Sequence, residues 1–170
     1  MSEQKQASAR ECFVCGVANP VGLHLKFVET HPGEVTAEVT LPEHFQGYPG
    51  IAHGGIIAAM LDETGGRTHM GSADAVRFSF TIHLDVRYRK NVPVGQPLRL
   101  VGKAKERKGR TAKAVSAIYD VDGTLLAEAD VVLVDVPARM VQDVDLDALG
   151  WRVYSDEELS QAAGKSVDCL

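Results

Sequence analysis

The sequence predicts an α+β domain in which one long central helix packs against a single curved antiparallel sheet. Two strand-like segments precede the only long helical segment, and four more follow it with no helix between them. A helix set apart from a run of hairpin-connected strands is typical of α+β architecture. In chain order the strand, strand, helix and four later strands are expected at residues 23–29, 35–41, 54–69, 78–88, 98–105, 112–119 and 125–136.

Turn chemistry and residue alternation justify these elements in order. A Pro-Gly turn at residues 31–34 joins the first two strands into a hairpin, and Asp122-Gly123 marks a later tight turn. Residues 155–158 form a capping box and Gly164 is a helix stop, so a short helix is expected within 145–164. Period-two alternation in residues 78–88 places one row on a common face: Phe78, Phe80, Ile82, Leu84, Val86 and Tyr88.

Length and composition indicate one ordinary globular domain. The 170 residues are 45% hydrophobic and 24% charged, with a net charge of -5 that argues against general nucleic-acid or anionic-membrane binding. We find no apolar run of the ~20 residues that span a bilayer, no signal-peptide pattern and too few cysteines for a disulfide scaffold. A cytoplasmic protein is expected, with a flexible N-terminus (1–11), one domain (12–136) and a C-terminal tail with a short helix (137–170).

The two faces of the helical segment differ in composition. One face should pack on the sheet, and the opposite face is built from glycine and alanine apart from Asp62. Asp62 has no cation three or four residues away in the sequence. Glycines in a helix cost about 1 kcal/mol each, usually offset by close approach of another backbone or a ligand. A solvated face with one solubilising Asp is the alternative. The sheet-facing set is Ile56, Ile57, Met60, Leu61 and Thr64, and the opposite set is Gly55, Ala58, Ala59, Asp62, Gly65 and Gly66.

The turn that opens this helix is suited to a negatively charged oxygen. Residues 52–55 read Ala-His-Gly-Gly, which leaves backbone N–H groups and the positive helix end at one place. Asp62 then supplies a potential nucleophile or base, so chemistry on a carbonyl is predicted. Gly54 and Asp62 are about 12 Å apart along one helix, too far to act on one carbonyl. Two antiparallel copies would bring them together, which predicts a homodimer, itself paired into a homotetramer.

The chain resembles the hotdog-fold acyl-CoA thioesterases over about residues 12–136. The branch it resembles includes the phenylacetic-acid-pathway thioesterases and mitochondrial members with a buried Asp. The resemblance is carried by residues 45–55, by Asp62 nine positions after His53, and by the strand end at residues 81–90. Residues 12–16 and 19–23 and the Asp122-Gly123 turn add to it. It implies a hydrolase that converts acyl-CoA and water to a carboxylic acid and free coenzyme A.

The resemblance also implies roles for particular residues. Asp62 would be nucleophile or general base, the Gly54 N–H would polarise the thioester carbonyl, and His53 would shape the turn. Thr81 would assist the water or the carboxylate, but strict alternation turns it away from the Phe80 row. A β-bulge or a subunit-interface position would be needed to bring it to the site. Gly55 is a substrate-binding candidate, and so is Gln46, because some relatives carry Asn where Gly47 stands here.

Basic residues gather near the ends of the later strands and could bind the phosphates of coenzyme A. The alternative is that edge-strand lysines such as Lys103 and Lys105 discourage aggregation. The cluster comprises Arg89, Lys90, Lys103, Lys105, Arg107, Lys108 and Arg110, of which Arg89, Lys90 and Arg110 are the phosphate-binding candidates. Two other functions stay open: a hotdog-fold acyl-thioester hydratase or dehydratase, and a non-catalytic acyl-CoA-binding module. The acyl group is not fixed by the sequence.

No metal or cofactor is expected from the motifs. Cys12-x-x-Cys15 could be half of a zinc site with His24 or His31 nearby, but four ligands are normally required and no second Cys pair exists. A turn with buried thiols is the preferred interpretation. A phosphate loop, a dinucleotide fingerprint and a Gly-x-Ser-x-Gly elbow are all missing from the sequence.

Overall fold

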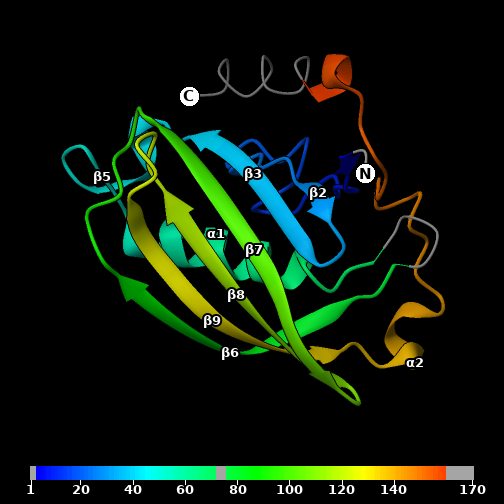
Figure 1. Ribbon diagram of the computed structural model, residues 1–170. Helices are drawn as coiled ribbons and strands as arrows, with labels where there is room; N and C mark the ends of the chain where they lie inside the picture. The colour runs from blue at the N-terminus through cyan, green and yellow to red at the C-terminus, as the bar shows by residue number, and fades with distance from the viewer. Residues whose placement is uncertain (1–2, 72–75, 160–170) are drawn as a thin grey trace.

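The protein folds as one helix laid against a seven-stranded antiparallel sheet. A computed structural model describes residues 3–71 and 76–159. The helix α1, Gly54–Arg67, lies along one face of the sheet, and the long strands curve past it (Figure 1). In sheet order the strands are β1 (Gln4–Lys5), β2 (Val28–His31), β3 (Glu34–Thr40), β7 (Pro97–Lys108), β8 (Thr111–Tyr119), β9 (Leu125–Asp135) and β6 (Ser79–Tyr88). This arrangement confirms the predicted α+β class.

Further short elements lie outside this main sheet. Before α1, the 3-10 helix η1 (Glu43–Phe45) leads into a small hairpin of β4 (Gln46–Tyr48) and β5 (Ile51–Ala52). After β9 comes α2, Ala138–Val141. Among the described residues, no helix has both the length and the apolar character needed to cross a membrane.

The predicted first strand is wrong in its position. Only Val28–His31 forms regular ladder pairs, although Leu23, Leu25 and Phe27 are buried. The Leu23 and Leu25 amides donate instead to the carbonyls of Phe13 and Val14, at 2.8 Å each. Alternation in this segment therefore arises from packing against the N-terminal turn, not from membership of the sheet.

Within residues 3–11 and 137–159, the described parts of the expected flexible N-terminus and C-terminal tail, several residues pair with the domain or with each other. Gln4–Lys5 pairs with β2, and Ser8 forms a bridge with Arg152. The predicted capping box is confirmed, because Ser155 Oγ accepts from Glu158 N at 3.3 Å and Ser155 N donates to the Glu158 carboxylate at 2.9 Å. The expected helix stop, Gly164, lies outside the described residues.

One face of α1 is buried largely as predicted. Ile57, Met60, Leu61 and Thr64 are buried against the sheet. Gly65 was placed on the opposite face, yet it is buried too, and a Cβ added there would lie 2.6 Å from Val131 Cγ2 of β9. Its missing side chain lets the helix approach the sheet closely. The Gly/Ala stripe is thus shared between the two faces of α1.

A β-bulge in β6 overturns the predicted face assignment of that strand. Thr81 is opposite Leu133 and His83 is opposite Val132, so Ile82 is an extra residue without a partner on β9. Directly opposed residues share a face. Since Leu133 is buried, Thr81 lies on the helix-facing side together with Leu84 and Val86. Phe80 and Ile82 are exposed, at 48% and 58%.

Candidate active site

At the N-terminus of α1, the cap leaves the backbone amide of Gly54 available to a ligand. His53 is the N-cap, and its Nδ1 accepts from the Gly55 amide at 2.9 Å. A neutral His53 in this role carries its proton on Nε2. The Tyr88 hydroxyl donates to the Gly54 carbonyl at 3.0 Å, which fixes the turn against the end of β6. Within the described part of the chain, the Gly54 amide has no acceptor, whereas the Gly55 amide is used by the cap.

Gln46 serves the loop that precedes the helix. Its Oε1 accepts from the Gly50 amide at 3.1 Å, inside the β4–β5 hairpin. A Cβ on neighbouring Gly47 would lie 3.2 Å from His53 Cα, so the small residue leaves room for the capping histidine. In this structure the Gln46 side chain is thus directed to its own hairpin.

A cavity of about 480 Å³ lies beside the C-terminal half of α1. Asp62 and Thr81 both line this cavity. The structure thus brings together two residues of separate elements that are candidate site residues from the sequence. Asp62 Oδ1 is buried and has no hydrogen-bond partner among the described residues. A buried carboxylate oxygen without a partner is unfavourable for stability, and such groups are concentrated at functional sites.

The cavity wall includes residues that the sequence did not assign to a site. Phe78 and Trp151 meet edge to face at a ring separation of 5.3 Å, so the segment after β9 closes one side of the cavity. Arg67 is 1% exposed, and its Nε pairs with Glu63 Oε1 at 3.0 Å as the i,i+4 spacing predicts. Its guanidinium also lies 4.5 Å from the Phe27 ring centroid, and Nη1 donates to the Ala7 carbonyl at 2.8 Å. The single Trp was the one available signal.

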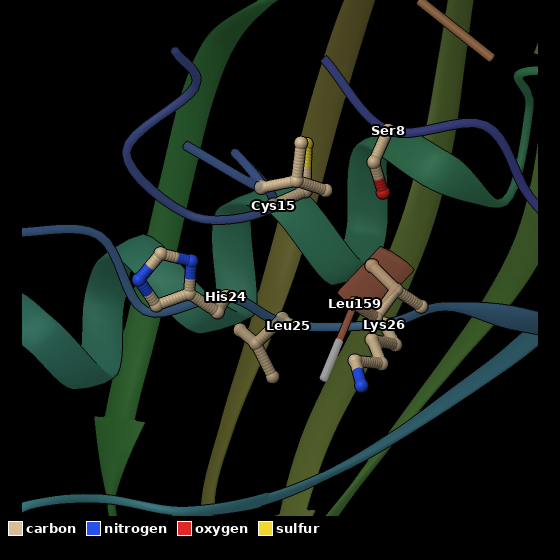
Figure 2. A pocket seen from close by; sticks show the side chains of 7 residues that line it. Ser8, Cys15, His24, Leu25, Lys26 and Leu159 are labelled. Atoms are coloured by element: carbon tan, nitrogen blue, oxygen red, sulfur yellow. The ribbon is translucent and has the colours of Figure 1, made fainter. Parts of the chain in front are cut away.

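The Cys12–Cys15 turn borders the same cavity. The hydrogen bond with Cys15 lowers the pKa of the Cys12 thiol to about 6. That bond, together with burial, raises the pKa of Cys15 above its usual range. Cys15 also lines a second pocket with Ser8, His24 and Leu25 (Figure 2), but this one is only about 30 Å³. It has room for about one water molecule, so the larger cavity is the candidate for an organic ligand.

The basic residues do not form one patch on a single chain. Arg89 Nε donates to Glu128 at 3.0 Å, near the start of β9. Arg110 donates to the carbonyl of Asp135 at 3.3 Å, at the end of the same strand. The two partners are seven residues apart on β9, which is about 23 Å along a strand. Lys90 lies beside Arg89, so the predicted phosphate-binding residues divide between two ends of the sheet.

One helix on a curved antiparallel sheet, with a cavity beside the helix, defines the hotdog class of domain. A family model described as "Thioesterase superfamily" matches residues 49–127. A protein of Saccharolobus solfataricus named "Putative esterase SSO2140" is 32% identical over 108 residues, covering 63% of this chain and 75% of that protein. The chain belongs to the thioesterase superfamily.

Two further similarities agree with this family. The crystal structure of protein RHA08564, a thioesterase superfamily protein, superposes with a TM-score of 0.67 at 30% identity. The match covers 74% of this chain and 63% of that one. The human acyl-coenzyme A thioesterase THEM5 is 39% identical over 51 residues, or 30% of this chain. This match spans only about a fifth of THEM5, 19% of its length.

Proposed function

We propose that the protein hydrolyses acyl-CoA thioesters to a carboxylic acid and free coenzyme A. The observation that carries this proposal is the Asp62 carboxylate, whose Oδ1 is buried, without a partner among the described residues, in a cavity that Thr81 also lines. Asp62 either attacks the carbonyl carbon or takes a proton from the attacking water. The Gly54 N–H stabilises the negative charge that develops on the carbonyl oxygen. The Thr81 hydroxyl orients the water or the carboxylate, and the sulfur leaves as coenzyme A thiol.

The apolar part of the cavity suits the acyl group. Phe78, Trp151 and Met70 line it near Asp62, and ligand sites combine such apolar walls with few polar groups. A hydratase would need a His beside the acid, and none of the described residues lining this cavity is a His. Measuring thiol and acid release from a panel of acyl-CoAs tests the proposal. Equal amounts of both products are expected, and a hydrated acyl-CoA without free thiol would contradict it.

The smallest active unit in this proposal is a symmetric dimer. Tyr88 holds Gly54 at the C-terminal end of β6, whereas Thr81 and the Asp62 cavity lie toward its start. One helix therefore separates donor and acid by about 12 Å. β6 is at the end of the sheet order, so one of its edges is unpaired within the described sheet. Antiparallel pairing of two β6 strands about a two-fold axis would bring each Gly54 toward the partner subunit's cavity.

Ile82→Asp is expected to convert the dimer to a monomer and to lower activity at least ten-fold. Ile82 is on the bulge of β6 and 58% exposed, so the change does not disturb the core. Two-fold pairing would bring two new negative charges close together, which is destabilising for an interface. Light scattering at the assay concentration measures the mass. Val121→Asp, at a 70% exposed turn position, should leave mass and activity unchanged. A fully active Ile82→Asp monomer would refute the shared site.

Arg89→Ala and Arg110→Ala are each expected to raise KM for acyl-CoA about ten-fold while kcat stays within a few-fold. Phosphate contacts made equally in ground and transition states affect binding only. Arg89 is half-exposed and pairs with Glu128, and such surface ion pairs contribute about 0–1 kcal/mol, whereas Arg110 donates to the backbone carbonyl of Asp135. Both guanidinium groups can therefore exchange these contacts for phosphate. Arg99→Ala, on β7, is the control. With acyl-pantetheine, which lacks the nucleotide, the variants and the wild type should have equal KM. An unchanged KM for acyl-CoA in both variants would eliminate these contacts.

A further inference from the structure

We propose that Cys12, Cys15 and Glu63 form a binding site for a zinc-class divalent metal ion at the wall of the cavity. One ligand atom from each of the three residues lies within 4.8 Å of the others. Two sulfurs and one carboxylate oxygen are a donor set for a borderline-soft ion such as Zn²⁺. Their mutual spacing allows a tetrahedral ion to be bound after small side-chain adjustments. All three residues line the large cavity, which leaves the fourth coordination position to water or a ligand there.

Hydrogen bonds within the N-terminal turn fix the backbone that carries Cys12 and Cys15. The Cys15 amide donates to Cys12 Sγ at 3.5 Å, and the Gly16 amide donates to the Cys12 carbonyl at 2.8 Å. The chain is so tight that a Cβ on Gly16 would lie 2.2 Å from the Cys12 carbonyl oxygen. The two sulfurs are therefore fixed on one side of a turn that only glycine can complete.

Glu63 supplies the third ligand from a different element. It belongs to α1 and stands next to Asp62, about fifty residues along the chain from the cysteines. Arg67 Nε orients its Oε1 at 3.0 Å, which is the kind of outer hydrogen bond that positions metal ligands. The histidines considered from the sequence are not in this cluster. His24 Nδ1 bonds to the Gly16 carbonyl at 2.7 Å, and His31 ends β2.

Charge balance supports a divalent cation. When a metal ion binds, both thiols lose their protons to solvent. The two thiolates and the Glu63 carboxylate then carry −3 and the buried Arg67 guanidinium contributes +1, so a divalent ion makes the group neutral. Buried charges are favourable only when they are paired or bound to a metal. The bound ion would join the N-terminal turn to α1 at the residue beside Asp62, and so fix the cavity wall. This role does not depend on the thioesterase proposal.

Metal binding by the reduced full-length chain tests the site without substrate. After chelation and reloading, elemental analysis should give about one zinc per chain. Cobalt(II) should replace zinc and give the thiolate-to-cobalt charge-transfer absorption of a tetrahedral site. Cys12→Ser and Cys15→Ser should weaken zinc binding at least 100-fold and remove that absorption. Glu63→Gln should weaken binding about ten-fold or more while keeping the absorption, which covers the case in which a Cys variant fails to fold.

Two control variants make the assignment specific. Cys169→Ser removes a thiol outside the described residues, and Glu38→Gln removes an exposed carboxylate of β3. Both should bind zinc as the wild type does. The proposal is overturned if the wild type gives no cobalt–thiolate absorption, or if Glu63→Gln binds zinc with wild-type affinity. Formation of a Cys12–Cys15 disulfide in the presence of excess zinc would also overturn it.

Discussion

Asp62→Asn is expected to lower kcat for acyl-CoA hydrolysis by about 10²-fold or more. The amide is nearly isosteric with the carboxylate, so α1 should pack on the sheet as before. It cannot act as a nucleophile on the carbonyl or accept a proton from water, so the loss falls on the chemical step. KM should change little, because the proposed contacts to coenzyme A are made by Arg89 and Arg110 and not by Asp62.

The same variant should unfold at a higher temperature than the wild type. Asp62 Oδ1 is buried and finds no partner in the part of the chain that the structure describes, and relieving such a group commonly raises stability at the expense of activity. Single-turnover kinetics and thermal unfolding measure the two effects. Asp122→Asn, in the exposed turn before β9, is the matched control and should change neither. If Asp62→Asn retains wild-type hydrolysis, the proposed catalytic role of Asp62 is refuted.

The helix α1 and the positions of Gly54 and Asp62 in it could be predicted from the sequence because their signals are local. The His-Gly-Gly turn and the 3.6-residue period place Gly54 at the start of α1 and Asp62 two turns later, as observed. The four later strands were also predicted within a few residues, since each is bounded by its own turn chemistry. Only the first strand failed, because burial against another loop produces the same alternation as a sheet.

The position of Thr81 could not be predicted with the same local reasoning. Period two in residues 78–88 puts Thr81 opposite Phe80 and Ile82, but the pairing with β9 adds one extra residue at Ile82. A bulge of this kind is set by the partner strand, and Ile82 itself carries no mark of it. The bulge places Thr81 on the side of the sheet where Asp62 lies. A bulge was one of the two ways in which Thr81 could take the role that the family resemblance implies.

Long-range contacts account for the other omissions. Glu63 completes a cluster with two cysteines of the N-terminal turn, and Trp151 returns from beyond β9 to the cavity. Neither contact has a spacing rule, since both depend on how the terminal segments cross α1. The basic residues show the reverse error. They lie within one stretch of the sequence, residues 89–110, but Arg89 and Arg110 contact residues at opposite ends of β9.

Gly54→Pro is expected to lower kcat by about 10²- to 10³-fold, the usual effect of losing one donor to a developing oxyanion. Proline removes the amide hydrogen, which is the only group that the proposed mechanism takes from this residue. The fold should tolerate the change. Gly54 is the first residue of α1, a position that favours proline, and His53 has φ −62° and ψ 138°, which suit a residue before proline.

Gly54→Ala separates the amide from the added bulk. A Cβ at Gly54 would lie 3.5 Å from the Tyr88 hydroxyl, an ordinary contact, so both variants should unfold within a few degrees of the wild type. Alanine keeps the N–H, and its kcat should exceed that of Gly54→Pro at least ten-fold. Equal losses in the two variants would mean that bulk and not the missing hydrogen is responsible, and the Gly54 amide would then have no part in stabilising the carbonyl oxygen. Mixing Gly54→Pro with Asp62→Asn subunits extends the test, because a shared site predicts that one of the two sites in each mixed dimer regains both groups and activity returns in part.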